Sequence, residues 1–369
     1  MEIDDLERIH QDFFAPTFVV TIGGQDLVRD LHLTVASVSV DLKEKASGRF
    51  TITVTNAFSW EDREFVAGAA DSRVHLLDLF KFGTEVDVRL GYGEPARLSS
   101  VMTGTITELA TSFGASGAPQ LELSGYDRLF GLTIGKEKDY LEEATDSDYV
   151  RRIAARHGLQ ADVTDTTPKK PRIEQNEETD LAFLEKLAGR NENFTFYVRN
   201  ERLYFGPRHR AAADIVLPWG GGLTAFNPEV NLANQIAAVE VVGTDAETGE
   251  QIVGRAERVL PEGRDGAEGS GPERLAEALN SEPVLRVRAG VHTQDEAKSK
   301  AAGILNERAN KFLTGSADCI GLPELRPDIN VAFEGLGQGF SKTYWVNGVV
   351  HEISGAGFTT SLTVEETGI

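Results

Sequence analysis

Hydrophobic and polar residues alternate along the first third of the chain. A period of two places every second side chain on the same face of a β-strand, so each run predicts a strand with one buried and one polar face. Six or so runs at this spacing favour an antiparallel barrel or sandwich. The runs lie at residues 18–22, 38–42, 50–54, 86–90, 103–109 and 120–124.

The pattern becomes helical after Gly135. Residues 147–157 carry apolar side chains on one stripe and are followed by a glycine, which predicts a short helix. A second helix is predicted to begin at Thr179, whose hydroxyl can cap it. Two short aromatic strands then flank Asn200-Glu201, which predicts a tight hairpin. We therefore expect a small α+β domain over residues 133–211.

Strand-like runs resume at residues 215–217 and 237–242. The segment 246–311 is rich in Gly, Glu and Arg, and it predicts an exposed excursion with a weak helix at 272–279. Thr293-Gln294-Asp295-Glu296 is a capping-box pattern, so a helix is predicted to begin there and to run to the end of that segment.

One β-unit is repeated at the two ends of the chain. Residues 82–123 and 326–364 each contain an alternating strand, a Gly-x-(Ile/Val)-x-Glu-(Leu/Ile) strand, a glycine-bearing loop and a closing strand. The second strand reads Gly104 to Leu109 in one copy and Gly348 to Ile353 in the other. A repeat at this distance predicts two related β-domains, although antiparallel meanders can also resemble each other by chance.

The repeat fixes a residue-by-residue alignment and a division into domains. The fold class is therefore expected to be mainly β, with two related tube-like antiparallel β-barrels and an inserted α+β domain. Equivalent core-facing pairs are predicted to be Ile106 with Val350, Leu109 with Ile353, Val88 with Val331, and Val86 with Ile329. The predicted domains are an N-terminal arm (1–16), a first barrel (17–132), the α+β domain (133–211), a discontinuous second barrel (212–245 and 312–369) and the excursion with its helix (246–311).

Composition excludes several classes of function. The 369-residue chain has a formal net charge of -21, which argues against a nucleic-acid-binding surface and against adsorption to anionic membranes. The single Cys319 excludes an intrachain disulfide framework and is expected to be a buried small hydrophobe. The polar, acidic start resembles no signal peptide, and no apolar run is long enough to cross a bilayer. We therefore expect a soluble protein made in the cytoplasm.

Candidate catalytic chemistry is sparse. The seven histidines form no His-x-x-x-His or His-x-His pair, so a zinc site has no support, and no Gly-x-Ser-x-Gly nucleophile motif occurs. Chance pairing among 58 acidic residues accounts for the candidate carboxylates. His351 is expected on a strand face, and Trp219-Gly220-Gly221-Gly222 lacks the spacing of a phosphate loop. The carboxylates considered were Asp127, Glu177-Glu178 and Glu365-Glu366. We predict no catalytic, cofactor or metal site and no enzyme.

Several motifs together resemble those of phage late control protein D and related tail hub proteins. The chain also resembles the N-terminal part of type VI secretion spike proteins. The motifs together cover most of residues 18–364. The motifs are Gln175 to Ala188 with its Glu-Thr-Asp, Phe-Leu and Leu-Ala elements, the aromatic stretch Phe194 to Tyr197, Phe82 to Tyr92, Gly125 to Asp127, and Gly321 to Pro327 leading to Tyr344 to Val346.

The resemblance implies a structural baseplate hub, in which three chains present six tube-like barrels and adapt a threefold spike to a sixfold inner tube. The implied partners are itself as a homotrimer, a spike protein expected to be a separate chain because this one stops at Ile369, the inner tube and other baseplate proteins. A phage tail and a secretion-like injection device stay open, as does the cargo. The alternatives are a cell-wall- or cargo-binding module of the same particle and a tail-associated cell-wall hydrolase.

The polar connection at residues 43–49 is the candidate interface. Its Lys43, Lys45 and Arg49 are too polar for a core. Long hairpins in tube-like barrels mediate contacts between neighbours in the family that the chain resembles, whereas a purely solvated loop is the alternative. We expect these three cations to contact a neighbouring chain.

Overall fold

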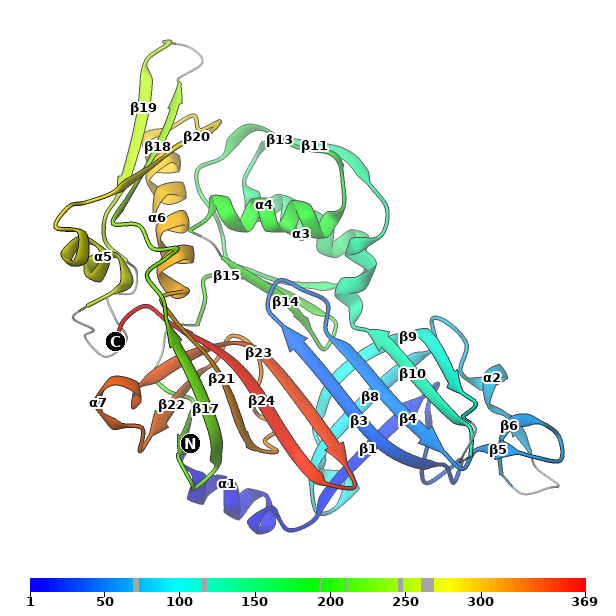
Figure 1. Ribbon diagram of the computed structural model, residues 1–369. Coiled ribbons are helices and arrows are strands. Elements are labelled where there is room, and N and C mark those ends of the chain that lie inside the picture. The colour runs from blue at the N-terminus through cyan, green and yellow to red at the C-terminus, as the bar shows by residue number, and fades with distance from the viewer. Residues whose placement is uncertain (69–72, 115–117, 193, 210–211, 245–247, 260–268) are drawn as a thin grey trace.

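The protein consists of one long β-sheet with two smaller α+β units beside it, as Figure 1 shows. The sheet has 13 strands, which confirms the predicted mainly-β class with small α+β parts. The computed structural model describes residues 1–68, 73–114, 118–192, 194–209, 212–244, 248–259 and 269–369, so parts of the predicted excursion (246–247 and 260–268) lie outside the described residues.

The first half of the sheet surrounds its own core. Alternate residues of its strands are buried, for example Phe50, Ile52 and Val54, as the period of two predicts. A small group formed by β5 (Phe58–Ser59), β6 (Glu64–Ala67), β7 (Val74–His75) and α2 (Leu76–Leu79) extends from its outer end. The strands are β1 (Pro16–Ile22), β2 (Gln25–Asp26), β3 (Thr34–Lys43), β4 (Arg49–Thr55), β8 (Glu85–Tyr92), β9 (Ser100–Ser112) and β10 (Gln120–Tyr126), with a 3-10 turn η3 (Pro95–Arg97).

The second half surrounds a separate core to which the N-terminal arm contributes. The arm forms helix α1 (Ile3–Ile9) and the turn η1 (Gln11–Phe13), and Leu6 is fully buried in this second core. The strands are β16 (Ile215–Pro218), β17 (Leu223–Val230), β21 (Leu313–Ile320), β22 (Asn330–Glu334), β23 (Thr343–Ser354) and β24 (Gly357–Glu366), with a short helix α7 (Gly337–Phe340).

The two halves repeat the same strand order. Hydrogen-bonded neighbours run β3-β4-β10-β9-β8-β1 in the first half and β17-β21-β24-β23-β22-β16 in the second, with β2 added beyond β1. The strands that take the same place in the two halves of the sheet also come in the same order along the chain. One difference is that β1 pairs with β8 antiparallel, whereas β16 pairs with β22 parallel. The predicted strand order of the two β-units is therefore the same, which argues against a chance resemblance.

The halves are joined edge to edge. Residues 343–345 of β23 pair with β22, and residues 348–354 continue past β22 to pair antiparallel with β3 of the first half. The cores touch at the same place, because Ile353 and Phe358 pack into the first core. The two predicted barrels are thus parts of one continuous sheet.

The burial predicted from the repeat is observed at some positions and not at others. Val88 and Val331 are each fully buried in their own cores, and Val86 and Ile329 are buried with them. Ile106 is buried, but Val350 is only half-buried and Val349 takes the inward position.

A slipped register explains the Val350 error. Both strands carry a β-bulge, at Thr107 in β9 and at Asn347 in β23, and aligning the two bulges matches Ile106 with Val346 and Leu109 with Val349. Ile353 also departs from the prediction, because it packs into the core of the first half rather than its own. Its predicted equivalent, Leu109, is half-buried against that same core.

The α+β unit follows β10 through the 3-10 helix η4 (Arg128–Thr133). Its helices begin at threonine caps: Thr145 accepts from the amide of Asp148 and Thr179 from that of Ala182. Asn200 and Glu201 both have positive φ, as a two-residue hairpin turn requires. The elements are β11 (Glu137–Ala144), α3 (Asp146–Arg156), β12 (Gln160–Val163), β13 (Lys170–Glu178), α4 (Asp180–Arg190), β14 (Thr195–Arg199) and β15 (Arg202–Gly206).

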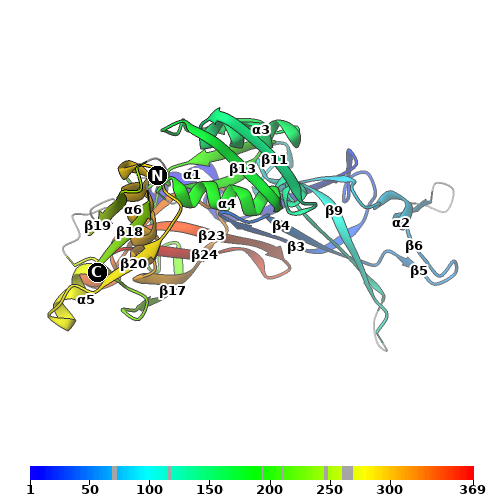
Figure 2. The same cartoon turned by 90° about the horizontal axis from the view of Figure 1, so that it is seen from above.

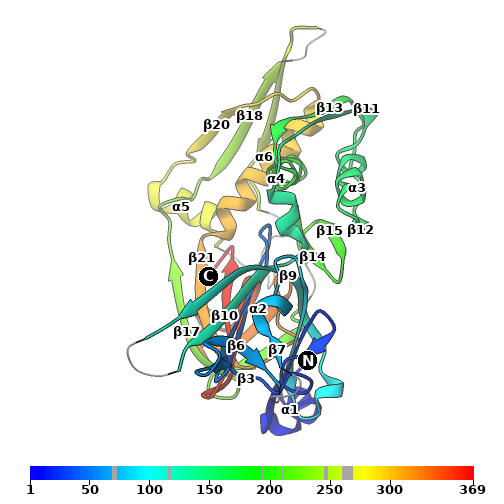
Figure 3. The ribbon, with the colours of Figure 1, turned by 90° about the vertical axis from the view of Figure 1, so that its right-hand side faces the viewer.

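A second small unit lies between β17 and β21. Its strands β18 (Ala238–Thr244), β19 (Gln251–Ala256) and β20 (Val284–Arg288) form a separate sheet that packs on helix α6 (Gln294–Asn310), and α5 (Gly271–Leu279) precedes β20. Figures 2 and 3 show this unit beside the α+β unit. The strand expected at 237–242 therefore belongs here and not to the second half, because it pairs with β19 and β20.

Truncation of a buried valine in either half should destabilise the protein to a similar extent. Val88→Ala and Val331→Ala each remove buried methyl groups and leave a cavity, and each should lower the free energy of unfolding by about 1–3 kcal/mol in urea titrations. Val28→Ala, at a residue that is 42% exposed, is the matched control and should change stability little. A cost confined to one half would contradict the structural equivalence.

Candidate functional site

The candidate interface at residues 43–49 is the connection between β3 and β4, and it packs mainly against its own chain. Lys43 is exposed and pairs with Asp41 at 3.1 Å. The backbone amide of Lys45 donates to the carbonyl of Phe196 in the α+β unit at 3.0 Å, and burial lowers the pKa of the Lys45 ammonium. Lys43 is the most exposed of the three predicted cations.

Arg49 lies at the base of the same connection. Its guanidinium pairs with the Glu108 carboxylate on β9 at 2.9 Å and lies over the ring of Tyr126, 5.7 Å from its centroid. Both partners come from the first half of the sheet. Arg49 therefore stabilises the strand group to which it belongs.

Arg208 connects three parts of the molecule in a buried cluster. Its guanidinium pairs with Glu44 of the β3–β4 connection at 2.7 Å and with Glu365 of β24 at 3.2 Å. It also stacks over the Trp345 ring of β23, with 3.8 Å between its central carbon and the ring centroid. The side chains of Arg208, Glu44 and Glu365 are between 10% and 13% exposed, so these charges are largely removed from water.

Asp328 extends this cluster into the loop before β22. Its carboxylate accepts from the indole N–H of Trp345 at 3.1 Å and from the backbone amide of His209 at 2.7 Å. Burial raises the pKa of this carboxyl, and the two donated hydrogen bonds oppose that rise. The backbone leaving the α+β unit is thus tied to the second half immediately after Arg208.

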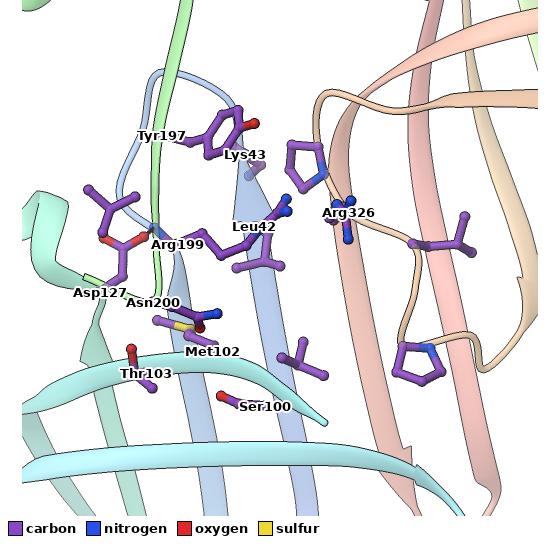
Figure 4. Close-up of a pocket in the computed structure, with 16 residues that line it drawn as sticks. Leu42, Lys43, Ser100, Met102, Thr103, Asp127, Tyr197, Arg199, Asn200 and Arg326 are labelled. Carbon is purple, nitrogen blue, oxygen red and sulfur yellow. Dashed lines mark hydrogen bonds between the residues drawn. The ribbon is translucent and has the colours of Figure 1, made fainter. Parts of the chain in front are cut away.

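A cavity of about 120 Å³ lies beside this cluster, where the first half, hairpin β14–β15 and the 323–327 loop meet. Figure 4 shows Arg199 of the hairpin extending toward Arg326 of the loop. Apolar side chains including Leu42, Met102 and Leu325 form much of the rest of its wall.

Asp127 also borders this cavity, but its oxygens are occupied. One oxygen accepts from the amide of Gly48 and the other caps η4 through the amide of Leu129, both at 2.9 Å. Burial raises the pKa of Asp127 to about 7, while these two hydrogen bonds act in the opposite direction. Its role is to join the β3–β4 connection to the start of the α+β unit.

His351 is fully buried on β23 and makes two structural hydrogen bonds. Nε2 lies 3.0 Å from the carbonyl of Leu325, which can only accept, so Nε2 carries the proton. Nδ1 therefore accepts from the Thr360 hydroxyl at 2.9 Å. Burial lowers the pKa of His351 to about 4, so the ring is neutral at physiological pH.

The remaining candidate residues lie apart from one another. Glu178 pairs with Lys186, and Glu365 belongs to the Arg208 cluster. Cys319 is buried, as the sequence predicts, and burial raises the pKa of its thiol. The glycines at 220–222 form the turn between β16 and β17. In the parts of the chain that the structure describes, no three His, Cys, Asp or Glu residues are grouped to hold a metal ion.

Across the same described ranges, no helix has the length and apolar character needed to span a bilayer.

Sequence reasoning missed Arg208, Arg199 and Arg326. Their only sequence signal is that each is a basic residue next to a predicted strand or loop, and many exposed arginines share that signal.

Removal of Arg208 should destabilise the molecule strongly. Arg208→Met keeps the contact with Trp345 but removes the guanidinium that pairs with both Glu44 and Glu365, which should cost about 3–5 kcal/mol in the free energy of unfolding. Arg8→Met removes a surface pair with Asp5 and should cost less than about 1 kcal/mol. Equal effects in urea titrations would show that the buried cluster is not a structural joint.

Acid should destabilise the protein through His351. Its pKa is about 4 in the folded state and 6.5 ordinarily, so the unfolded state binds the proton first, and about 3 kcal/mol of stability is lost as pH falls from 6.5 to 4. His351→Gln should flatten the stability profile in that window, whereas His292→Gln, at an exposed residue, should leave it unchanged. Thermal melts across this pH range measure the difference.

Comparison with known proteins places the chain in a family. Residues 16–355 match the family model described as the Alg8 N-terminal domain. The search of curated proteins found no match.

Solved structures of tail proteins have the same fold. A 43 kDa tail protein of prophage MuSo2 from Shewanella oneidensis has a TM-score of 0.70 at 14% identity, with 95% of this chain and 98% of that chain covered. A tail protein from Neisseria meningitidis MC58 has a TM-score of 0.69 at 15% identity, covering 96% and 98%. The E. coli c3393 protein, described as a component of the type VI secretion system, has a TM-score of 0.56 at 13% identity, covering 94% and 76%.

The structural likeness confirms the fold that the resemblance to tail hub proteins implied. The chain belongs to the family described as the Alg8 N-terminal domain, and it has the fold of phage tail proteins.

Proposed function

We propose that this chain is a structural hub in the baseplate of a contractile phage tail or a related injection system. Three copies form a ring that presents six similar β-units, and the ring adapts a threefold spike to a sixfold inner tube. The observation that carries the proposal is the repeat of six strands in the same spatial order. The fold shared with tail proteins and with a type VI secretion component supports the setting.

The sheet edges indicate how copies would join. Within the chain, β23 of the second half pairs with β3 of the first. The equivalent strands are β9 in the first half and β17 in the second. Among the described residues, positions 108–112 of β9 pair only with β10, and positions 225–230 of β17 pair only with β21. Both edges can therefore accept another strand, and Pro228 is a position on the β17 edge that has no amide to donate.

Pairing of β9 in one copy with β17 in the next would repeat between chains the joint that exists within the chain. Such a contact joins two different surfaces, so it closes into a ring when the rotation between copies divides a full turn evenly. Three chains with two β-units each would give a pseudo-sixfold ring.

Exposed aromatic side chains lie close to the open part of β9. Phe113 directly follows β9 and is 65% exposed, and Trp60 in the β5–β6 turn is 70% exposed. Both rings contact Phe58 edge-on, at 5.7 and 5.3 Å between centroids. Large exposed apolar groups gathered in one place are typical of an interface, and these would be covered by the neighbouring copy.

The proposed role is structural rather than enzymatic. The buried acid and base candidates, Asp127 and His351, are engaged in contacts that hold backbone segments together. The partners we propose are two further copies of the chain, a spike protein, the inner tube and other baseplate proteins. Assembly would take place in the cytoplasm, and the mature location would be the particle. Of the three hairpin cations, Lys43 remains our candidate for an intermolecular contact, since Lys45 and Arg49 are engaged within the chain.

A proline in β17 should separate assembly from folding. The amide of Asn231 donates to Phe312 on the β21 side, so the alternation of the strand directs the amide of Val230 to the open edge. Pro228 already occupies the same side without disturbing the pairing of β17 with β21. Val230→Pro should therefore leave the monomer folded and abolish the trimer, as measured by light scattering with spike or tube protein present.

Val230→Thr is the matched control, because it keeps the backbone donor and the branched shape; it should still assemble. Trimers of Val230→Pro with unchanged stability would contradict the edge-to-edge contact. A wild-type chain that forms only dimers or hexamers in the reconstituted particle would contradict the hub itself.

A further inference from the structure

We propose that the cavity between Arg199 and Arg326 binds an acidic side chain, flanked by an apolar residue, from a different protein of the same particle. The site rests on the proposed function for its setting, but its chemistry comes from the cavity alone. Its volume of about 120 Å³ suits one side chain. Its walls come from β3 and β9, from hairpin β14–β15 and from the 323–327 loop, so a bound group would contact three separate parts of the chain.

The two arginines provide the positive charge. Arg199 is half-buried, and its guanidinium carbon lies over the ring of Tyr197 in the same hairpin, 5.5 Å from the ring centroid. In the described part of the chain, no carboxylate lies within ion-pair distance of Arg199 or Arg326. Arg156, by contrast, reaches the Asp180 carboxylate at 2.7 Å. Burial and the nearby Arg326 lower the pKa of Arg199, while Tyr197 and Asp328 act in the opposite direction, and an anion between the two arginines would offset their mutual repulsion.

The other charged groups of the wall leave this positive charge unbalanced. Asp127 uses both oxygens to accept hydrogen bonds from the backbone amides of Gly48 and Leu129. Lys43 at the rim adds a further positive charge and pairs with Asp41 outside the cavity. A planar carboxylate matches the fork of guanidinium donors, which makes it the favoured anion.

The apolar part of the wall selects a peptide over a free inorganic anion. Met102 is 5% exposed and Leu325 is fully buried, and both line the cavity with Leu42 and Pro323. This surface would contact the methylene groups of a glutamate or the side chain next to it. Arginines beside an apolar pocket are typical of the residues that contribute most to protein interfaces.

The position of the cavity points to a different protein rather than a second copy. The β9 residues that line it, 100–103, belong to the part of the strand already paired with β8. No residue of β17 lines it. The edges that would join copies are therefore separate from this site, and it stays free for a spike or baseplate component after the ring has closed.

Methionine methyl NMR tests the proposal directly. The chain has two methionines, Met1 and Met102, so labelled methyl groups give one reporter inside the cavity and one at the N-terminus as an internal control. The probe is acetyl-Leu-Glu-Leu-amide at millimolar concentrations, and acetyl-Leu-Gln-Leu-amide is its uncharged match. We expect a saturable shift of the Met102 signal with the glutamate peptide, a much weaker one with the glutamine peptide, and no shift of Met1.

Variants separate this site from general electrostatics. Arg199→Gln should weaken binding of the glutamate peptide by about tenfold or more, whereas Arg288→Gln, at an exposed residue on β20, should leave it unchanged. Thermal melts confirm that each variant is folded. Equal shifts from both peptides, or a peptide affinity no greater than that of inorganic phosphate, would overturn the proposal.

A second copy of the chain is a distinct outcome. If the Met102 signal shifts with protein concentration alone, the occupant is another copy and the choice of a different protein is wrong. The oligomeric state of Val230→Pro and Val230→Thr does not depend on this cavity. Loss of the peptide site would therefore leave the hub proposal standing, and failure of the ring would leave the peptide measurement interpretable.

Discussion

The burial of Arg208 between two carboxylates and an indole ring is the constraint on which the arrangement of the molecule depends. Its partners come from the β3–β4 connection, from β23 and from β24, and Arg208 itself belongs to the linker after the α+β unit. A buried charge is tolerated only while its counter-charges stay in place. None of these parts can move without exposing or isolating a charge, so the cluster fixes their relative positions.

The edge-to-edge pairing of β23 with β3 joins the two halves of the sheet through their backbones. Because β23 extends past β22, the two repeated units share backbone hydrogen bonds and not only side-chain contacts. Backbone pairing depends little on side-chain identity, which allows the same joint to recur where the sequences of the units have diverged. The chain thus contains within itself one example of the contact that a ring of copies requires.

Titratable groups in this molecule divide into two kinds. Asp127, His351 and Asp328 have pKa values moved by burial, but each is hydrogen-bonded to the backbone or to neighbouring side chains. Arg199 and Arg326 both line the cavity, and among the described residues neither forms an ion pair with a carboxylate. A perturbed pKa alone therefore does not identify a site here; unmatched charge next to an apolar wall does.

The sequence by itself determined the local elements and their order, because hydrophobic period, threonine caps and turn residues act over a few positions. It predicted the strands of the first half, the cap at Thr179 and the repeat of the β-units. The tertiary structure alone decided the bulge that turns Val349 inward, the pairing of β18 with β19 and β20, and the meeting of Arg208, Glu44 and Glu365. These depend on backbone pairing and on contacts between residues more than a hundred positions apart, and neither leaves a local pattern.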